Sequence, residues 1–168
     1  MEAIYYSTFD SSLLGEVFVA STEKGVLMVD FLKSERAFLE RLKKRFPGEV
    51  VRDDRRSKEI LLQIRKYLTG QLRCFDYPMD LRGTPFEKKV WMELVKIPYG
   101  KTRSYKEVAQ AIGHPKAFRA VGNANGSNAL PLIIPCHRVI ASGGGLGGYG
   151  HGLKMKKQLL DFERDHGT

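Results

Sequence analysis

Segments of apolar residues separated by turns dominate the start of the chain. Three segments rich in β-branched and aromatic residues, at 2–9, 15–21 and 25–31, are separated by the turn-forming stretches "SSLLG" and "TEKG". Short segments of this kind, divided by turn residues, are typical of strands that pair with their neighbours along the chain. The pattern therefore predicts a three-stranded β-meander.

Helical periodicity replaces this pattern in the next part of the chain. Apolar side chains recur every three or four residues over 34–46 and 57–70, and each segment opens on a serine that can act as an N-cap. The stretch "CFDYPMDLRG" that follows is interrupted by proline and glycine, and it is expected to form an extended linker. Residues 1–82 are thus predicted to form a small α/β domain with its linker.

Residues 83–168 contain clear helix signals. "TPFE" at 84–87 and "SYKE" at 104–107 are capping boxes, in which Thr or Ser at the N-cap is followed three residues later by Glu. The first of these helices is expected to reach about residue 97, because Pro98 stops it. The second is expected to end at a turn before residue 116, where a third helix begins. Two short helices joined by a tight turn suggest a helix-turn-helix.

The net charge of +9 lies mainly in this second half. Residues 1–82 carry 15 Lys and Arg against 13 Asp and Glu, whereas residues 83–168 carry 13 against 6. Evenly spread basic charge would indicate only a solvated surface. Its concentration in one segment favours a polyanionic partner such as nucleic acid.

The sequence also restricts the compartment and the cofactors. No apolar run is long enough to cross a membrane, and the first residues lack the pattern of a signal peptide, so we expect a cytoplasmic protein with no membrane partner. Cys74 and Cys136 are expected to be free thiols in that reducing compartment, Cys74 in a structural role. No cluster of soft ligands has the spacing of a zinc site, so no metal and no cofactor are predicted.

The expected third helix is built mainly from small residues. They are Ala117, Ala120, Gly122, Ala124 and Gly126. Glycine in a helix interior costs about 1 kcal/mol relative to alanine, so their accumulation calls for a reason. Composition alone favours tight packing against a neighbouring helix. The alternative is close approach to a nucleic-acid groove, with Arg119 as an exposed cation that enters the base stack.

The segment "LPLIIPCHRVI" at 130–140 places Cys136 and His137 side by side. Its apolar residues predict a buried strand, and Pro135 favours an extended residue before it. Neighbouring side chains of an extended chain point to opposite sides, so a water or a bent turn is needed to pass a proton from the thiol to the imidazole. A buried cysteine taken alone is more often inert packing than a nucleophile.

A carboxylate in the last helix, expected over 154–166, offers a third member for this site. Glu163 falls on the same helix face as Leu159 and is therefore directed inward with it. An inward carboxylate needs a partner. It either forms a salt bridge with a basic residue such as Arg138, or it orients His137 so that the imidazole can accept a proton.

The string "IPCHRV", with "RAVGNANGSN" and "PLI" before it and "GGLGGYGHG" after it, closely resembles the signature of the O6-alkylguanine-DNA alkyltransferases, also called methylated-DNA-protein-cysteine methyltransferases. The resemblance runs from "TPFEKKVW" to "LLDFE", and in the first half it is limited to the order of the elements. It implies an α+β protein. Residues 1–82 would form a ribonuclease H-like α/β domain, and residues 83–168 a mainly helical DNA-binding and alkyl-acceptor domain with a helix-turn-helix.

The resemblance also implies an activity. The protein would act as a monomer on double-stranded DNA that contains O6-alkylguanine, with O4-methylthymine as a further candidate substrate. It would flip the damaged nucleotide out of the duplex and transfer the alkyl group irreversibly to Cys136, once per molecule.

Roles for individual residues follow from the same resemblance. The catalytic set comprises Cys136 as acceptor, His137 as the base that acts through a water, Glu163 as the carboxylate that orients it, Asn128 as the tie between the recognition helix and the active-site turn, and Tyr105 as the donor to guanine N3. The pocket is expected to be lined by Pro131, Val139, Tyr149 and Gly150, with carbonyls of Cys136 and Val139 facing the exocyclic amine. DNA contacts are expected at Thr102, Ser104, Lys116, Arg119, Ala120, Gly122 and Asn123.

Three other classes of protein are set against this interpretation. Binding-only relatives commonly have Trp at the acceptor position, which Cys136 argues against. A cysteine hydrolase would turn over many substrate molecules and would not need a helix-turn-helix. A DNA-binding regulator would bind without modifying itself. His151 departs from the family pattern of a small residue in the pocket loop, which puts the entry of bulky alkyl groups in doubt.

Overall fold

The computed structural model describes residues 1–167, which divide into two compact units. The first unit covers residues 1–81 and the second begins at Arg82. Within the described chain no helix is long and apolar enough to cross a membrane.

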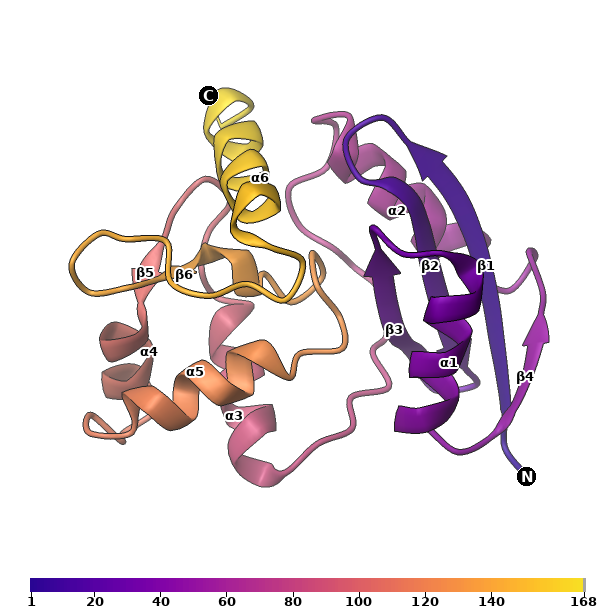
Figure 1. Cartoon of the computed structure of the whole chain (residues 1–168), viewed down its shortest axis with the longest axis horizontal. Helices are drawn as coiled ribbons and strands as arrows, with labels where there is room; N and C mark the ends of the chain where they lie inside the picture. The colour runs from indigo at the N-terminus through magenta and orange to yellow at the C-terminus, as the bar shows by residue number, and fades with distance from the viewer. Residues whose placement is uncertain (168) are drawn as a thin grey trace. The chain divides into compact units, whose positions relative to one another are not determined.

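The first unit is built on a four-stranded sheet with the strand order β3-β2-β1-β4 (Figure 1). The meander prediction holds for β1 (Ala3–Ser11), β2 (Gly15–Thr22) and β3 (Gly25–Phe31), which pair antiparallel in chain order. The sequence analysis did not predict β4 (Glu49–Arg52), which pairs parallel with β1. This strand has only four residues and no buried one, so it leaves no periodic signal.

Two helices pack on opposite faces of this sheet (Figure 1). On α1 (Glu35–Arg45), the Phe38 ring stacks 4.8 Å from that of Phe18 in β2. On α2 (Lys58–Leu68), the Arg65 guanidinium lies 5.1 Å from the ring of Phe9 in β1. Phe9 and Phe18 belong to opposite sides of the pleat, because Phe18 is registered with Thr8, the residue next to Phe9. The sheet is therefore covered on both faces.

The expected linker is partly held on the edge of the sheet. Pro78 accepts a hydrogen bond from the Val26 amide at 2.9 Å, and the amide of Asp80 donates to the Val26 carbonyl at 2.8 Å. Gly25 makes this approach possible, since a Cβ at this position would lie 2.2 Å from the Pro78 oxygen. These bonds cover the free edge of β3, which would otherwise present unpaired backbone groups. Cys74, expected to be structural, is exposed in this segment.

The second unit consists of helices around a short parallel pair of strands (Figure 1). Its elements are α3 (Pro85–Leu94), β5 (Arg103–Ser104), α4 (Tyr105–Ala111), α5 (Phe118–Gly126), the 3₁₀ turn η1 (Cys136–Arg138), β6 (Val139–Ile140) and α6 (Leu153–Asp165). Helix α3 ends three residues before the predicted position, and α5 begins two residues after it. Trp91 of α3 is buried and its indole donates to the Ala124 carbonyl of α5 at 2.7 Å, which fixes these two helices together.

Both predicted capping boxes are present. Thr84 accepts from the Glu87 amide at 3.1 Å, and the Glu87 carboxylate accepts from the Thr84 amide at 2.9 Å. Ser104 and Glu107 make the same reciprocal pair at the start of α4. At Ser34 the hydroxyl caps α1 as expected, whereas Ser57 occupies the N-cap position of α2 without a capping bond from its side chain.

Removing the cap of α3 should lower stability by a measurable amount. Thr84→Ala leaves the Glu87 amide without its acceptor, and we expect the free energy of unfolding to fall by about 1 kcal/mol. Urea denaturation followed by circular dichroism measures the change. Thr84→Ser keeps the hydroxyl and should behave like the wild type, so equal losses in both variants would contradict a capping role.

The segment 130–135 is buried, as predicted, but it is not a strand. It forms consecutive turns, with Leu132 at φ 75° and the Ile134 amide donating to the Leu130 carbonyl at 2.8 Å. The prediction failed because an apolar run shows burial without distinguishing strand from turn. Pro131 and Pro135 lack the amide donors that a strand ladder needs, which favours turns here.

Candidate active site and nucleic-acid interface

Cys136 opens the turn η1 and is 5% exposed. Of the two alternatives left open by the sequence, the chain takes the bent turn: the Arg138 amide donates to the Pro135 carbonyl at 3.0 Å and closes a 3₁₀ turn. Successive side chains of a 3₁₀ turn point about 120° apart. The side chains of Cys136 and His137 therefore leave the turn in different directions, and His137 is fully buried.

Glu163 of α6 fixes the orientation of His137. The Nε2 atom of His137 lies 2.7 Å from Oε2 of Glu163, and both side chains are fully buried. A carboxylate acceptor requires the proton of a neutral imidazole to be on Nε2, so Nδ1 carries the free lone pair. Nδ1 is buried and has no hydrogen-bond partner among the described residues. The site therefore contains an oriented, unoccupied base.

Arg138 also pairs with Glu163, so this carboxylate makes both of the contacts that were set as alternatives. Its Nε and one Nη each donate to a different carboxylate oxygen at 2.8 Å, and the other Nη donates to the Ile97 carbonyl at 2.7 Å. The amide of Gly100 adds a bond of 3.1 Å to Oε1. Burial alone would raise the pKa of Glu163, but the bonds from His137 and Arg138 outweigh it and hold the pKa well below its ordinary value. The carboxylate is thus kept ionised.

The thiol and the imidazole are both neutral in the resting site. Burial raises the pKa of Cys136, although a hydrogen bond with Asn128 and the charge of Lys156 act in the opposite direction. Burial lowers the pKa of His137 below its ordinary value, and the bond to Glu163 opposes it only in part. Both shifts favour the neutral form of the side chain concerned.

Asn128 lies where the resemblance places it, between α5 and the active-site turn. Its Nδ2 donates to the Ile134 carbonyl at 2.9 Å, and its Oδ1 accepts from the Leu130 amide at 2.9 Å. Asn125, which was not among the site residues predicted from the sequence, is buried in α5 and donates from Nδ2 to the Cys136 carbonyl at 3.3 Å.

Lys156 is a second site residue that the sequence analysis did not identify. It is fully buried, and its Nζ donates to the Val139 carbonyl at 2.6 Å and to the Gly148 carbonyl at 3.0 Å. Burial lowers its pKa to about 8. The signal was present, because Lys156 precedes the inward-facing Glu163 by seven residues, which is two helical turns on the same face.

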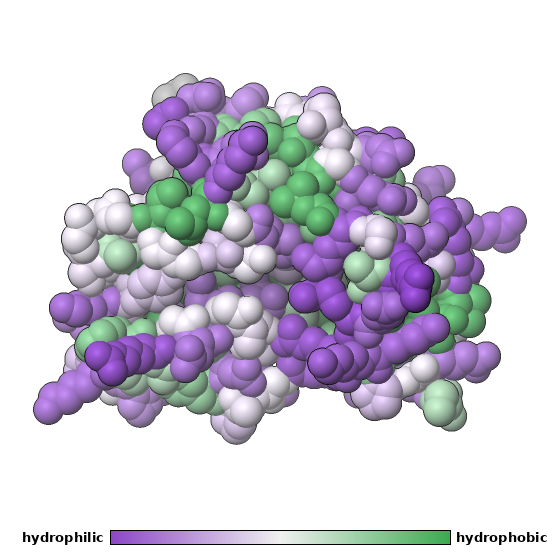
Figure 2. Space-filling model, viewed as in Figure 1, coloured by the Kyte–Doolittle hydropathy of each residue, from purple (hydrophilic) through white to green (hydrophobic). Residues whose placement is uncertain are grey.

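The glycine-rich loop between β6 and α6 (Figure 1) contains Gly147, which lies against Tyr105, the first residue of α4. At Gly147, with φ 70°, a Cβ would lie 2.9 Å from two atoms of the Tyr105 side chain, so this approach requires glycine. Figure 2 shows the loop as pale surface, because glycine is neither strongly polar nor strongly apolar.

The remaining predicted pocket residues lie at different depths. Val139 and Pro131 are buried, whereas Gly150 is exposed. The Tyr149 hydroxyl is buried with no hydrogen-bond partner among the described residues, and burial raises its pKa well above the ordinary value. The second unit thus brings the thiol, the base and its carboxylate together, with Tyr105 close to the loop beside them.

The predicted DNA-contact residues lie on α5 and on the segments before α4 and α5. Arg119, Ala120 and Asn123 are exposed on one face of α5, while Val121 and Ala124 pack on the other. The buried face agrees with the packing interpretation, whereas the contact with a nucleic-acid groove stays a prediction. Thr102 and Lys116 are also exposed, whereas Gly122 is half-buried. Ser104 is buried, and its side chain caps α4.

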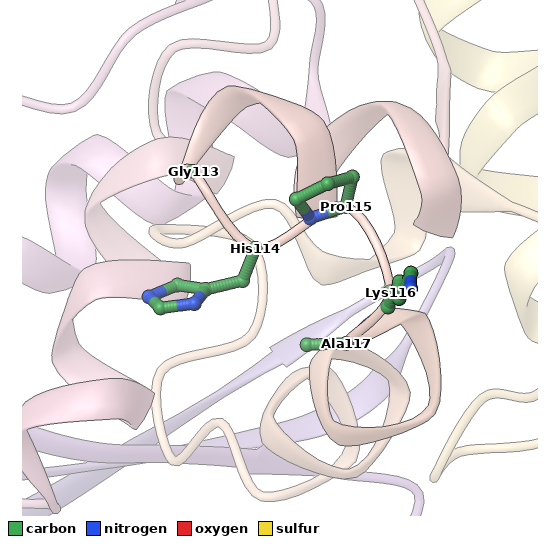
Figure 3. Close-up of a pocket in the computed structure, with 5 residues that line it drawn as sticks. All are labelled: Gly113, His114, Pro115, Lys116 and Ala117. Atoms are coloured by element: carbon green, nitrogen blue, oxygen red, sulfur yellow. The ribbon is translucent and has the colours of Figure 1, made fainter.

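The turn between α4 and α5 forms a shallow pocket lined by residues 113–117 (Figure 3). Gly113 has φ 81° and lets the chain reverse direction tightly. In Figure 3 the His114 ring and the Lys116 side chain lie on opposite sides of the turn. This geometry is that of a helix-turn-helix, with α5 in the position of the recognition helix.

The fold and the site define a DNA-binding type of protein that carries a buried thiol beside a histidine–carboxylate pair. The chain belongs to the 6-O-methylguanine DNA methyltransferase family. The family's DNA binding domain matches residues 85–165 of this chain, and the family's ribonuclease-like domain matches residues 4–81. Among the described residues, no group of three or more His, Cys, Asp or Glu is placed to hold a metal ion.

Individual relatives agree with the family models. A methylated-DNA–protein-cysteine methyltransferase of Methanosarcina barkeri is 41% identical over 163 residues, which is 97% of this chain and 99% of the relative. A relative of the same name from Mycobacterium bovis is 53% identical over 102 residues, covering 61% of this chain and 62% of that one. The crystal structure of Mycobacterium tuberculosis OGT in complex with DNA superposes with a TM-score of 0.82 at 38% identity, over 96% of this chain and 94% of that one.

Proposed function

We propose that this protein repairs DNA by direct reversal, transferring the alkyl group of O6-alkylguanine to its own Cys136. The observation that carries the proposal is the bond of 2.7 Å between His137 Nε2 and Glu163, which leaves Nδ1 as the basic nitrogen of the residue that directly follows the buried Cys136. Family membership supports the same reaction, because relatives along the whole chain are named for it.

The proposed reaction requires a proton transfer followed by a displacement. His137 Nδ1 takes the thiol proton through a bridging water, and the thiolate attacks the alkyl carbon. The carbon–O6 bond breaks as the carbon–sulfur bond forms, and its electron pair leaves with guanine. Tyr105 donates to guanine N3, and the amide of Gly150 faces O6, so that charge on the leaving base is stabilised.

Single turnover follows from the product. A thioether has no leaving group that water can displace under these conditions, so each molecule acts once. The thiol must remain reduced until then, which favours a reducing compartment such as the cytoplasm. Every residue assigned here lies in the second unit of one chain, so a monomer is sufficient.

Binding is proposed to use the α5 face and the segments around it. Lys116 and Thr102 would contact phosphates, together with the start of α4 at Ser104, and α5 would enter the groove through Ala120, Gly122 and Asn123. Arg119 would occupy the place of the flipped nucleotide. A base within a duplex is unreachable for a buried thiol, which is why flipping belongs to this mechanism.

A direct test detects the methyl group on the protein. The protein is mixed with an excess of duplex DNA containing one O6-methylguanine, digested, and analysed by peptide mass spectrometry. We expect the Cys136 peptide to gain one methyl group and the reaction to stop at one equivalent. Continued turnover, or a gain confined to Cys74, would exclude the proposal.

Arg119→Ala should slow repair of duplex DNA selectively. Unstacking of the flipped nucleotide costs a few kcal/mol, and without the long side chain nothing compensates this cost. We therefore expect the rate of methyl transfer from duplex DNA to fall on the order of tenfold or more. Single-stranded O6-methylguanine needs little flipping and should react almost normally. Single-turnover rates of methyl transfer are measured on both substrates. An equal loss of rate on both would argue against the insertion of Arg119 in place of the flipped nucleotide.

A further inference from the structure

A large apolar side chain, Phe118, lies exposed at the start of α5, whose other exposed residues are small or polar. Phe118 is 38% exposed and is followed directly by Arg119. A single apolar side chain at a protein surface needs no explanation in itself. Its position does, because α5 is the helix proposed to approach DNA and the proposed site makes no use of this ring.

Phe118 lies on the side of α5 that faces the start of α4. The two helices lie side by side (Figure 1), and the Lys106 ammonium of α4 lies 5.5 Å from the centre of the Phe118 ring. One turn further along α5, a Cβ at Gly122 would lie 3.9 Å from the ring of Tyr105, the residue before Lys106. Phe118 therefore borders the surface formed by Tyr105 and Gly122, both of which belong to the proposed site.

The charge around Phe118 is positive. Lys106, Lys116 and Arg119 are exposed, and none of these three cations forms an ion pair with another described residue. Glu107 follows Lys106, but its carboxylate is used in the cap of α4, where it accepts from the Ser104 amide at 3.0 Å. Unpaired cations gathered on one surface favour an anionic partner.

The chemistry of Phe118 and Lys106 matches that of a DNA backbone. Each nucleotide presents an apolar sugar face next to an anionic phosphate, and these two side chains present an apolar ring next to a cation. Packing of the ring on a sugar removes apolar surface from water, which stabilises the complex. Contacts with sugars and phosphates position a protein on a duplex without reading its sequence.

We propose that Phe118 and Lys106 form a contact with the DNA backbone beside the flipped nucleotide. Phe118 packs on a sugar, and Lys106 pairs with the adjacent phosphate. The contact falls beside the flipped nucleotide because Phe118 directly precedes Arg119, which is proposed to occupy the vacated place in the stack. The inference rests on the proposed binding of duplex DNA through α5, and it adds two residues to that interface.

The two residues should differ in how their loss responds to salt. Binding to undamaged duplex DNA is measured by fluorescence anisotropy over a series of salt concentrations. Lys106→Met removes one phosphate contact, so the slope of the logarithm of the binding constant against the logarithm of salt concentration should become shallower by about 0.9. Phe118→Ala removes apolar contact and no charge, so binding should weaken about fivefold at every salt concentration, with the wild-type slope.

Matched variants separate a DNA contact from a general effect of the exchange. Met92 of α3 is 46% exposed and Lys44 of α1 is exposed, and neither belongs to the proposed interface. Met92→Ala and Lys44→Met should therefore keep the wild-type affinity and slope. Phe118→Leu keeps an apolar side chain and should bind more tightly than Phe118→Ala. Circular dichroism checks that each variant is folded.

The contact should affect binding rather than chemistry. With duplex DNA that contains O6-methylguanine, Phe118→Ala and Lys106→Met should both need a higher DNA concentration to reach the half-maximal rate of methyl transfer to Cys136. The maximal rate at saturating DNA should stay close to that of the wild type, because neither side chain touches the reacting atoms.

Three results would overturn the inference. They are wild-type affinity in Phe118→Ala, an unchanged salt slope in Lys106→Met, and effects of the same size in a variant and its matched control. In each of these cases methyl transfer to Cys136 still occurs, so the proposed function would stand. A wild type that takes no methyl group from O6-methylguanine would instead refute the proposed function.

Discussion

Replacing Cys136 by serine is expected to abolish methyl transfer while leaving binding to DNA intact. A serine hydroxyl has a far higher pKa than a thiol, so His137 cannot generate the corresponding anion. The exchange removes no hydrogen-bond donor of the helix-turn-helix, whose exposed face lies on α5. Transfer is measured from duplex DNA with a labelled O6-methyl group, and binding by a mobility-shift assay.

The other cysteine provides the matched control. Cys74→Ser changes an exposed thiol in the first unit and should react at the wild-type rate. Methyl transfer that persists in Cys136→Ser, or that disappears in Cys74→Ser, would contradict the assignment of the acceptor.

Replacing Glu163 by glutamine should affect stability and rate together. The exchange leaves the buried Arg138 guanidinium without a counter-ion, which we expect to lower the free energy of unfolding by about 3–5 kcal/mol. His137 would also lose the carboxylate that fixes its tautomer, so methyl transfer by the remaining folded protein should be slower. Urea denaturation at neutral pH and single-turnover kinetics measure the two effects.

The effect on stability should depend on pH in a defined direction. The folded state holds the pKa of Glu163 below its ordinary value of 4.5, so the stabilisation is fully present above about pH 5 and is lost as the pH falls through the lower folded value. The wild type and Glu163→Gln should therefore converge in acid. Asp161→Asn, which breaks only exposed pairs on the same helix, should change stability by less than about 1 kcal/mol. A difference that is independent of pH would contradict the role given to the ionised carboxylate.

Features controlled by local rules could be predicted from the sequence. The starts of α3 and α4 follow from capping boxes at Thr84 and Ser104, which depend only on residues three positions apart. The inward direction of Glu163 follows from helical spacing in the same way. The assignment of Cys136 and His137 as a reacting pair rests on the resemblance to a family and stays a proposal, since spacing alone does not indicate it.

Features that depend on distant contacts could not be predicted in this way. The strand β4 exists because β1 offers it a free edge, and nothing within its own four residues indicates this. The apolar residues at 130–135 suit a strand and a buried turn equally well, and the bonds to Asn128 decide between them. Helical spacing places Lys156 on the inward face, but only the folded chain shows that Asn125 and Lys156 each donate to a carbonyl of the active-site turn.

Because Gly147 lies close to Tyr105, the glycines of the loop should differ in how well they tolerate substitution. Gly147 combines a positive φ with a contact in which a Cβ would displace the Tyr105 side chain, so we expect substitutions there to be destabilising. Gly143, Gly145 and Gly148 have neither feature, since a Cβ at each would meet nothing within 4 Å. The loop looks uniform in sequence, but Gly147 should tolerate substitution poorly. Gly143, Gly145 and Gly148 should accept other residues without loss of the fold.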